Sequence, residues 1–279
     1  MSAGSGSGSG SGPGSGSGPG SGFGKALVII TGASRGFGRA LALSVAPRLS
    51  AGSVLVLSAR SEDRLLELKR DLGRGHPGIT VRCVAADLGC KAGVDRLITE
   101  TRDSATEPGI QTLLLVNNAA SLGDVSRRCR DFTDVCEVDS YLSLNVSSAL
   151  CVTAGVLRSV PGRPGLSRVV LNISSLCALR PFPSWVLYCS GKAARDMMFR
   201  VLAEEEPDLR VLNYAPGPLD TDMQLQARSS SADDALRNTF SVMHANGQLL
   251  TCDQSVSKLM TVLLEDTYPS GAHLDYYDL

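Results

Sequence analysis

Short, unbroken runs of apolar residues recur along the chain and alternate with longer stretches of helical periodicity. Such runs are typical of strands that are buried on both faces of a parallel sheet. They occupy residues 25–31, 53–58, 79–85, 112–116 and 168–173, and a sixth begins at 210–213. We expect the C-terminal segment to add an edge strand, which gives about seven strands in all.

Helical patterns fill the intervals between these runs. They cover residues 39–45, 62–72, 94–101, 134–157, 185–205 and 255–264, whereas the polar segment 229–235 is expected to be a mobile loop. Strands separated by helices of this length are joined by right-handed crossovers, with helices on both faces of the sheet. The pattern therefore predicts the α/β class: one doubly wound parallel sheet in a single domain.

The first 24 residues differ in composition from the rest of the chain, and we expect them to lie outside the folded domain. They hold 11 of the 29 glycines, 8 serines and 2 prolines, and no charged side chain. Such a composition buries too little apolar surface to offset the entropy of ordering. We expect residues 1–24 to be a flexible, disordered tail and residues 25–279 to be the folded domain.

Charge and cysteine usage exclude several classes of protein. Lys+Arg 27 against Asp+Glu 28 leaves no basic excess for nucleic acid. No apolar run approaches the ~20 residues that cross a bilayer, and we expect no secretory signal, because the tail lacks a basic and an apolar region. The eight cysteines form no Cys-x-x-Cys pair and no metal-binding spacing. We therefore expect no membrane or nucleic-acid partner and no metal, and we expect reduced thiols in a cytoplasmic protein.

A glycine-rich loop follows the first predicted strand and precedes a helix. Its residues are Gly32, Ala33, Ser34, Arg35, Gly36, Phe37 and Gly38. Glycines at such a turn let the backbone approach a pyrophosphate, which the helix N-terminus also attracts. The loop predicts a dinucleotide site and a Rossmann-type fold.

The residues after the next strands indicate which dinucleotide binds. The second strand ends at Ala59-Arg60, and an arginine there accommodates a 2′-phosphate, whereas a carboxylate would favour NAD. We expect Arg60 and Arg35 to converge on that phosphate and to select NADP(H), although Glu62 and Asp63 follow closely. Asp87 and Leu88 are placed to touch the adenine. Asn117 and Asn118 either brace the sheet or line the cofactor crevice, and both roles stay open.

Three side chains form a candidate catalytic group. Tyr188 and Lys192 share a helix face through their i, i+4 spacing. A nearby ammonium lowers the pKa of a phenol toward working pH, which makes Tyr188 a usable general acid. Ser175 follows the fifth strand and can hold the developing oxyanion. Asn145 is expected to bind a backbone group or a proton-relay water.

Together these motifs resemble the short-chain dehydrogenase/reductase family from about residue 25 to the end. The matching positions are 31–38, 117–120, Asn145, Ser175, Tyr188 and Lys192, with Ala120 where the family usually has glycine. The resemblance implies NADP-dependent reduction of a carbonyl. It also implies a homodimer built from the two long helices, and it adds the cofactor contacts Leu219, Asp220, Thr221, Asp222, Met223 and Gln224.

Further segments are similar to the pterin carbonyl reductases of this family. They are residues 31–39, 121–126, 172–179, 191–197, 211–223 and 270–273. The similarity implies reduction of a pterin side-chain carbonyl in the last step to tetrahydrobiopterin. It places Ser175, Leu176, Tyr188, Gly217 and Asp275 at the substrate. A carboxylate suits this role because it can accept from both N–H donors of a pterin edge.

Other readings remain open at this point. Leu122, Phe182 and Trp185 either wall the pocket or belong to the core, and Asp275 is otherwise a solvated charge near the chain end. The same machinery also fits a broad carbonyl or steroid reductase. A third reading is a catalytically weak NADP-sensing interaction protein.

Overall fold

The computed structural model describes residues 22–279. The predicted flexible tail therefore lies mostly outside the described residues. Its last residues, however, are packed: the Phe23 N–H donates to the Arg48 carbonyl (2.9 Å), and the Thr112 hydroxyl donates to the Phe23 carbonyl (2.8 Å). The folded domain therefore begins slightly before residue 25.

The seven strands form one parallel sheet in the order β3-β2-β1-β4-β5-β6-β7. The predicted doubly wound fold is confirmed, and the C-terminal segment supplies the edge strand. The bounds are β1 Ala26–Thr31, β2 Val54–Ala59, β3 Thr80–Ala85, β4 Thr112–Asn117, β5 Ser167–Ile173, β6 Leu209–Ala215 and β7 Ala272–Asp275.

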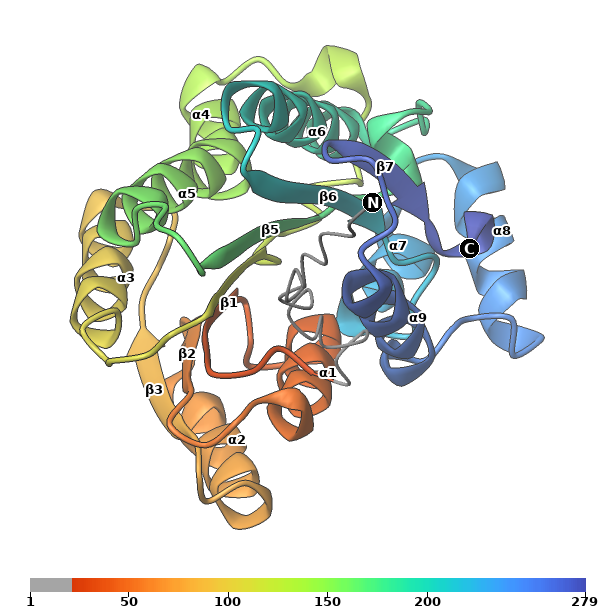
Figure 1. Cartoon of the computed structure of the whole chain (residues 1–279). Helices are drawn as coiled ribbons and strands as arrows, with labels where there is room; N and C mark the ends of the chain where they lie inside the picture. The colour runs from red at the N-terminus through yellow and green to blue at the C-terminus, as the bar shows by residue number, and fades with distance from the viewer. Residues whose placement is uncertain (1–21) are drawn as a thin grey trace, which may run out of the picture.

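Two helical layers cover the sheet (Figure 1). One layer holds α1 (Gly36–Val45), α2 (Glu62–Gly75) and α9 (Cys252–Glu265); the other holds α3 (Lys91–Ser104), α5 (Ser148–Ser159) and α6 (Val186–Glu205). Alternate residues of β1 enter opposite cores, Val28 and Ile30 the first and Leu27 and Ile29 the second, and all four are fully buried. This double burial explains why β1 is apolar at successive positions.

The long predicted helix is interrupted. It consists of α4 (Val135–Leu142), a π turn (Ser143–Ser147) and α5. The run Val135–Ser159 is long and apolar enough to cross a membrane, with 39% of its most apolar window buried in the fold. This differs from the expectation that no such run exists, because apolar side chains lie on its outer face as well as its inner one. Leu150, for example, is 54% exposed.

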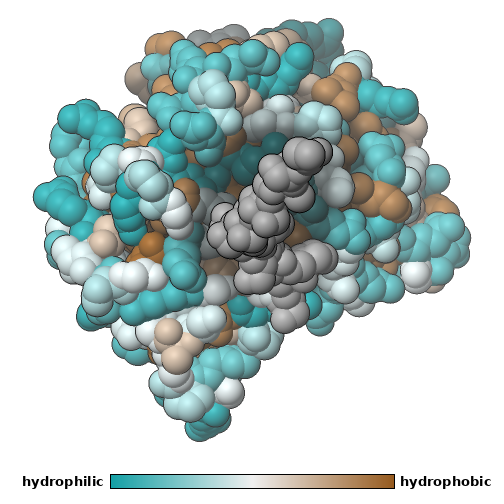
Figure 2. Space-filling model, in the orientation of Figure 1, coloured by the Kyte–Doolittle hydropathy of each residue, from teal (hydrophilic) through white to brown (hydrophobic). Residues whose placement is uncertain are grey.

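The segment expected to be a loop at 229–235 is partly helical. It holds the end of α7 (Asp222–Ser230) and the start of α8 (Asp234–Ala245), a helix that the pattern did not predict. α8 has no fully buried residue, and its apolar side chains Leu236 and Phe240 are only partly buried against Trp185 and its neighbours. On the face seen in Figure 2, hydrophilic residues predominate and apolar residues form small separate groups.

The strand order reverses at β1, which pairs with β2 on one side and with β4 on the other. The chain leaves these neighbouring strands in opposite directions, which opens a crevice at their carboxyl ends. The predicted glycine loop and Asn117–Ala120 both follow these strands.

Candidate active site

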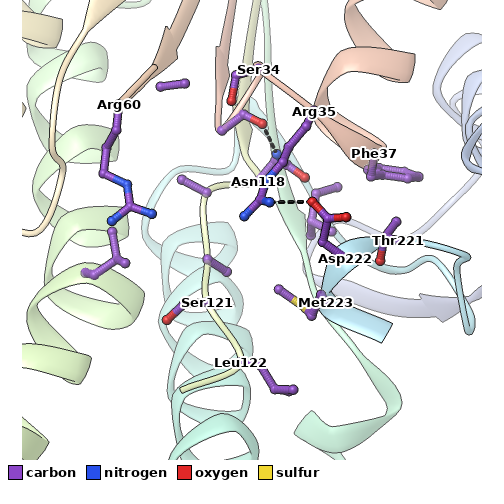
Figure 3. Close-up of a pocket in the computed structure, with 18 of the residues that line it drawn as sticks. Ser34, Arg35, Phe37, Arg60, Asn118, Ser121, Leu122, Thr221, Asp222 and Met223 are labelled. Atoms are coloured by element: carbon purple, nitrogen blue, oxygen red, sulfur yellow. Dashed lines mark hydrogen bonds and ion pairs between the residues drawn. The ribbon is translucent and has the colours of Figure 1, made fainter. Parts of the chain in front are cut away.

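A cavity of about 930 Å³ lies at this crevice, between the loops after β1 to β4 and the start of α7 (Figure 3). Most of the predicted cofactor residues line it. They are Gly32, Ser34, Arg35, Gly36, Phe37, Gly38, Ala59, Arg60, Asp87, Leu88, Lys192, Leu219, Asp220, Thr221, Asp222 and Met223.

Three of the predicted cofactor residues do not line the cavity. Ala33 is fully buried in the first core. Gln224 is buried too, and its side-chain amide donates to the Phe240 carbonyl (3.3 Å). Asn117 donates to the Thr153 hydroxyl of α5 (2.9 Å), so its contacts are those of a brace.

The glycine loop is a cradle that only glycine can form at two positions. Gly32 has φ +68°, a conformation that glycine adopts without strain. A Cβ on Gly38 would come within 2.4 Å of the Gly32 carbonyl oxygen. Asn118 lines the cavity and fixes the loop, because its side-chain amide donates to the carbonyls of Thr31 (2.8 Å) and Gly32 (3.1 Å). The cradle therefore fits the close approach of a pyrophosphate.

The cations at the edge of the cavity differ from the predicted pair. Arg60 lines it and is exposed, but Arg35 forms an ion pair with Asp222 at 2.5 Å (Figure 3). Arg64, in the first turn of α2, lines the same cavity and was missed. Arg64 follows Arg60 by four residues, and this spacing could have identified it in the sequence. Arg60 and Arg64, rather than Arg60 and Arg35, are the arginines free of an ion pair among the lining residues.

Tyr188 and Lys192 open onto the cavity from α6, one helical turn apart. The Lys192 ammonium donates to the Ile173 carbonyl (2.5 Å) and lies 5.6 Å from the centre of the Tyr188 ring. Ser175 lies two residues beyond β5, and its hydroxyl oxygen accepts from the Cys177 N–H (3.2 Å). It is close enough to Tyr188 to lower the pKa of that phenol. The three predicted side chains are therefore brought together.

Burial controls the charge state of this group. It is the largest of the causes that lower the pKa of Lys192 to about 7, and the nearby Arg195 is the second. It raises the pKa of Tyr188 above its usual value, while Ser175 and Arg195 act in the opposite direction. The prediction that the Lys192 ammonium lowers the Tyr188 pKa is therefore wrong for the described structure, because the cation that does so is Arg195.

Asn145 lies in the π turn, a distortion often found at functional sites. Its side-chain oxygen accepts from the Ser121 N–H (2.8 Å), and its amide donates to the Tyr141 carbonyl (2.9 Å). The predicted contact with a backbone group is thus present. Asn145 does not line the cofactor cavity, but it lines a smaller one of about 260 Å³ beside it.

Of the predicted substrate residues, Tyr188 lines the cofactor cavity, whereas Ser175, Leu176, Gly217 and Asp275 do not. Asp275 ends β7 in register with Ala215 of β6, so Asp275 and Gly217 follow the same edge of the sheet as Ser175. One Asp275 oxygen accepts from the Tyr277 N–H (3.0 Å). The carboxylate is thereby oriented by the turn that follows it.

Aromatic side chains pack around Tyr188. Trp185 meets the Tyr188 ring edge-on, with centroids 5.6 Å apart, and stacks on Phe240 of α8 at 5.4 Å. Trp185 is buried in this cluster with Leu122, which also lines the cavity. Phe240 was missed because α8 was not predicted.

A family model for short chain dehydrogenases matches residues 26–232. The chain therefore belongs to the short-chain dehydrogenase family, as the fold and the Ser175–Tyr188–Lys192 group indicate. The resemblance predicted from the motifs is confirmed.

Particular relatives are more similar still. The chain is 53% identical to sepiapterin reductase of Mus musculus over 255 residues, 91% of this chain and 98% of the relative. It is 51% identical to sepiapterin reductase of Bos taurus, again over 91% of this chain and 96% of the relative.

A solved structure shares the fold. L-sorbose reductase from Gluconobacter frateurii, complexed with NADPH and L-sorbose, has a TM-score of 0.75 and 26% identity. The match covers 92% of this chain and 96% of that one.

Proposed function

We propose that this protein uses NADPH to reduce side-chain carbonyls of pterins, such as sepiapterin and 6-pyruvoyl-tetrahydropterin, in the last step to tetrahydrobiopterin. The observation that carries the proposal is the meeting of Ser175, Tyr188 and Lys192 beside the glycine cradle. Identity of about half the residues to the mouse and bovine sepiapterin reductases supports the pterin assignment.

NADPH, when bound, supplies the hydride. The Gly32–Gly38 loop would hold its pyrophosphate, and Arg60 with Arg64 would bind the 2′-phosphate, since no carboxylate ends β2. Lys192 lies where it would bind the nicotinamide ribose. This set of donors fits NADP(H) better than NAD(H).

Tyr188 performs the proton transfer. Its hydroxyl donates to the carbonyl oxygen of the substrate, while the Ser175 hydroxyl donates a second hydrogen bond to the same oxygen. Burial keeps Tyr188 protonated, because its raised pKa holds the phenol neutral at ordinary pH. The proton is therefore available when the carbonyl oxygen becomes negative.

Asp275 gives the substrate its orientation. The carboxylate accepts from backbone N–H groups of the turn that follows it, including that of Tyr277, and its remaining lone pairs can accept from the 2-amino and N3–H donors of a pterin. Its place at the end of β7 puts this anchor on the same sheet edge as Ser175.

NADPH oxidation with sepiapterin tests the proposal. We expect saturable turnover with NADPH, a much lower rate with NADH, and a product with two additional hydrogens by mass spectrometry. Turnover of simple diketones without turnover of sepiapterin would instead indicate a broad carbonyl reductase. No oxidation with any carbonyl would favour the NADP-sensing reading.

We further propose a homodimer through α4, α5 and α6. Apolar side chains lie exposed on their outer faces: Val135 (67%), Leu150 (54%), Met197 (54%) and Val201 (46%). Grouped exposed apolar residues favour a protein interface. Light scattering should give a dimer for the native chain and a monomer for Leu150→Glu combined with Met197→Glu; a native monomer would contradict this.

Finally, we propose that the protein acts in the cytoplasm without a nucleic-acid or membrane partner. The eight cysteines are all free thiols, as is usual in reducing compartments. Fractionation of cells that express the chain should place its activity in the supernatant, and activity in the membrane pellet would contradict the proposal.

A further inference from the structure

Arg195 is a cation buried beneath the active site. Only 1% of its surface is exposed, although arginine is among the residues least often buried. Its guanidinium donates to the side chain of Asn172 (2.8 Å) and to the carbonyls of Asn117 (2.5 Å), Ala119 (3.1 Å) and Asn145 (3.4 Å).

These four acceptors come from three different parts of the site. Asn117 ends β4 and Ala119 lies in the following cavity loop, Asn172 lies near the end of β5, and Asn145 belongs to the π turn. Arg195 itself follows Lys192 by three residues and Tyr188 by seven on α6, so all three lie on one helix face. A single side chain thus connects the catalytic helix to β4 and the loop after it, to β5 and to the π turn.

The charge of Arg195 has no carboxylate bound to it. The neighbouring Asp196 is engaged elsewhere, accepting from Ser174 (2.5 Å), Asn172 (3.1 Å) and His273 of β7 (2.5 Å). Burying a cation against carbonyls alone is costly compared with a neutral side chain. A role that depends on both the hydrogen-bond geometry and the charge of the Arg195 guanidinium explains why an arginine occupies this position.

We propose that Arg195 is a positioning residue of the carbonyl reduction, which locks the ends of β4 and β5 and the π turn against the helix face that carries Tyr188 and Lys192. The inference rests on the proposed function and adds a residue to its machinery. It assigns to Arg195 a second task as a fixed positive charge near the proton donor.

The charges around Lys192 predict the direction in which Arg195 shifts the pKa of Lys192. Arg195 lowers the pKa of Lys192, whereas Asp196 raises it. The other titratable groups near the site are Tyr141, Cys177, Cys189 and His273, from α4, the turn after β5, α6 and β7. Lys192 loses its proton as the pH rises through about 7, so removing the Arg195 charge should keep Lys192 protonated to higher pH.

The test is the pH profile of kcat/KM for Arg195→Met. We expect kcat/KM at neutral pH to fall by about 10²-fold, because the reacting groups lose their alignment. We expect the alkaline limb of the profile to move up by about one pH unit. Arg195→Lys keeps the charge, so its limb should stay near that of the wild type and its activity should be partly restored.

Two further variants separate this role from simple destabilisation. Asp196→Asn should move the alkaline limb the other way, to lower pH. Arg168→Met is the matched control: Arg168 is also buried (8% exposed) but pairs with Glu206 at the far end of β5. It should lower Tm without moving the limb.

The proposal fails if the alkaline limb of Arg195→Met lies at the same pH as that of Arg168→Met. It also fails if Arg195→Lys and Arg195→Met shift the limb by the same amount. If Arg195→Met does not fold, the limbs of Arg195→Lys and Asp196→Asn decide, and a limb unmoved in Asp196→Asn overturns the charge role. If the wild type fails to reduce sepiapterin, the proposed function is wrong. The Arg195 variants are then compared through the pH dependence of NADPH binding, measured by its fluorescence, where the same shifts are expected.

Discussion

The cofactor end and the substrate end of the site are built in different ways. The cofactor cavity is lined mainly by short runs of consecutive residues, after β1 to β4 and at residues 219–223, and glycine backbone forms its cradle. The proposed substrate end instead combines single side chains from distant segments, such as Ser175, Tyr188 and Asp275. Local sequence therefore specifies the first region, whereas the tertiary fold assembles the second.

The largest expected effect lies where the two regions meet. Tyr188→Phe keeps the ring that packs on Trp185 but removes the proton donor. We expect kcat to fall by a factor of order 10² or more, while NADPH affinity, followed by fluorescence, changes little. Near-normal turnover in this variant would remove Tyr188 from the mechanism.

The substrate end can be tested alone with Asp275→Asn, whose amide oxygen can still accept from the Tyr277 N–H. We expect the KM for sepiapterin to rise roughly 30-fold, as expected for a charge-assisted hydrogen bond of ~2 kcal/mol. The KM for a simple diketone should be unchanged. Asp278→Asn, in the same turn, is the matched control, and equal effects on both substrates would exclude Asp275 as the anchor.

The cofactor end can be tested with Arg60→Ala. We expect the KM for NADPH to rise about 10-fold and the KM for NADH to stay the same, because only NADPH carries the 2′-phosphate. Arg70→Ala is the control, since Arg70 is exposed on the same helix as Arg64 but does not line the cavity. A parallel change with both cofactors would show that Arg60 does not bind the phosphate.

The smallest effect is expected from deleting residues 2–21. All residues that line the cavity lie between Gly32 and Gln226, so kcat and KM should remain within about twofold. A large loss of activity would show that the glycine- and serine-rich segment contributes to the site in addition to the cofactor end and the substrate end.

The sequence predicts the sheet well because buried parallel strands are continuously apolar. It predicts α8 poorly, since that helix is only partly buried, although Asp233 is its N-cap and accepts from the Leu236 N–H (2.9 Å). A short polar residue before a helical stretch is a recognised start signal. Here the surrounding serines obscured it.

The site shows the same division. The glycine loop and the Tyr188–Lys192 spacing are visible in the sequence because their chemistry depends on neighbours in the chain. The place of Arg195 is not visible, because an arginine in a helix is usually solvated. The ion pair of Arg35 with Asp222 joins the loop after β1 to the start of α7, which only the fold brings together.

A crystal structure with bound NADP and a pterin would test the central claim most directly. The account predicts the 2′-phosphate against Arg60 and Arg64, the pterin amino edge on Asp275, and the side-chain carbonyl oxygen within hydrogen-bonding distance of both Tyr188 and Ser175. A pterin bound away from Asp275, or a carbonyl that does not reach Tyr188, would contradict it.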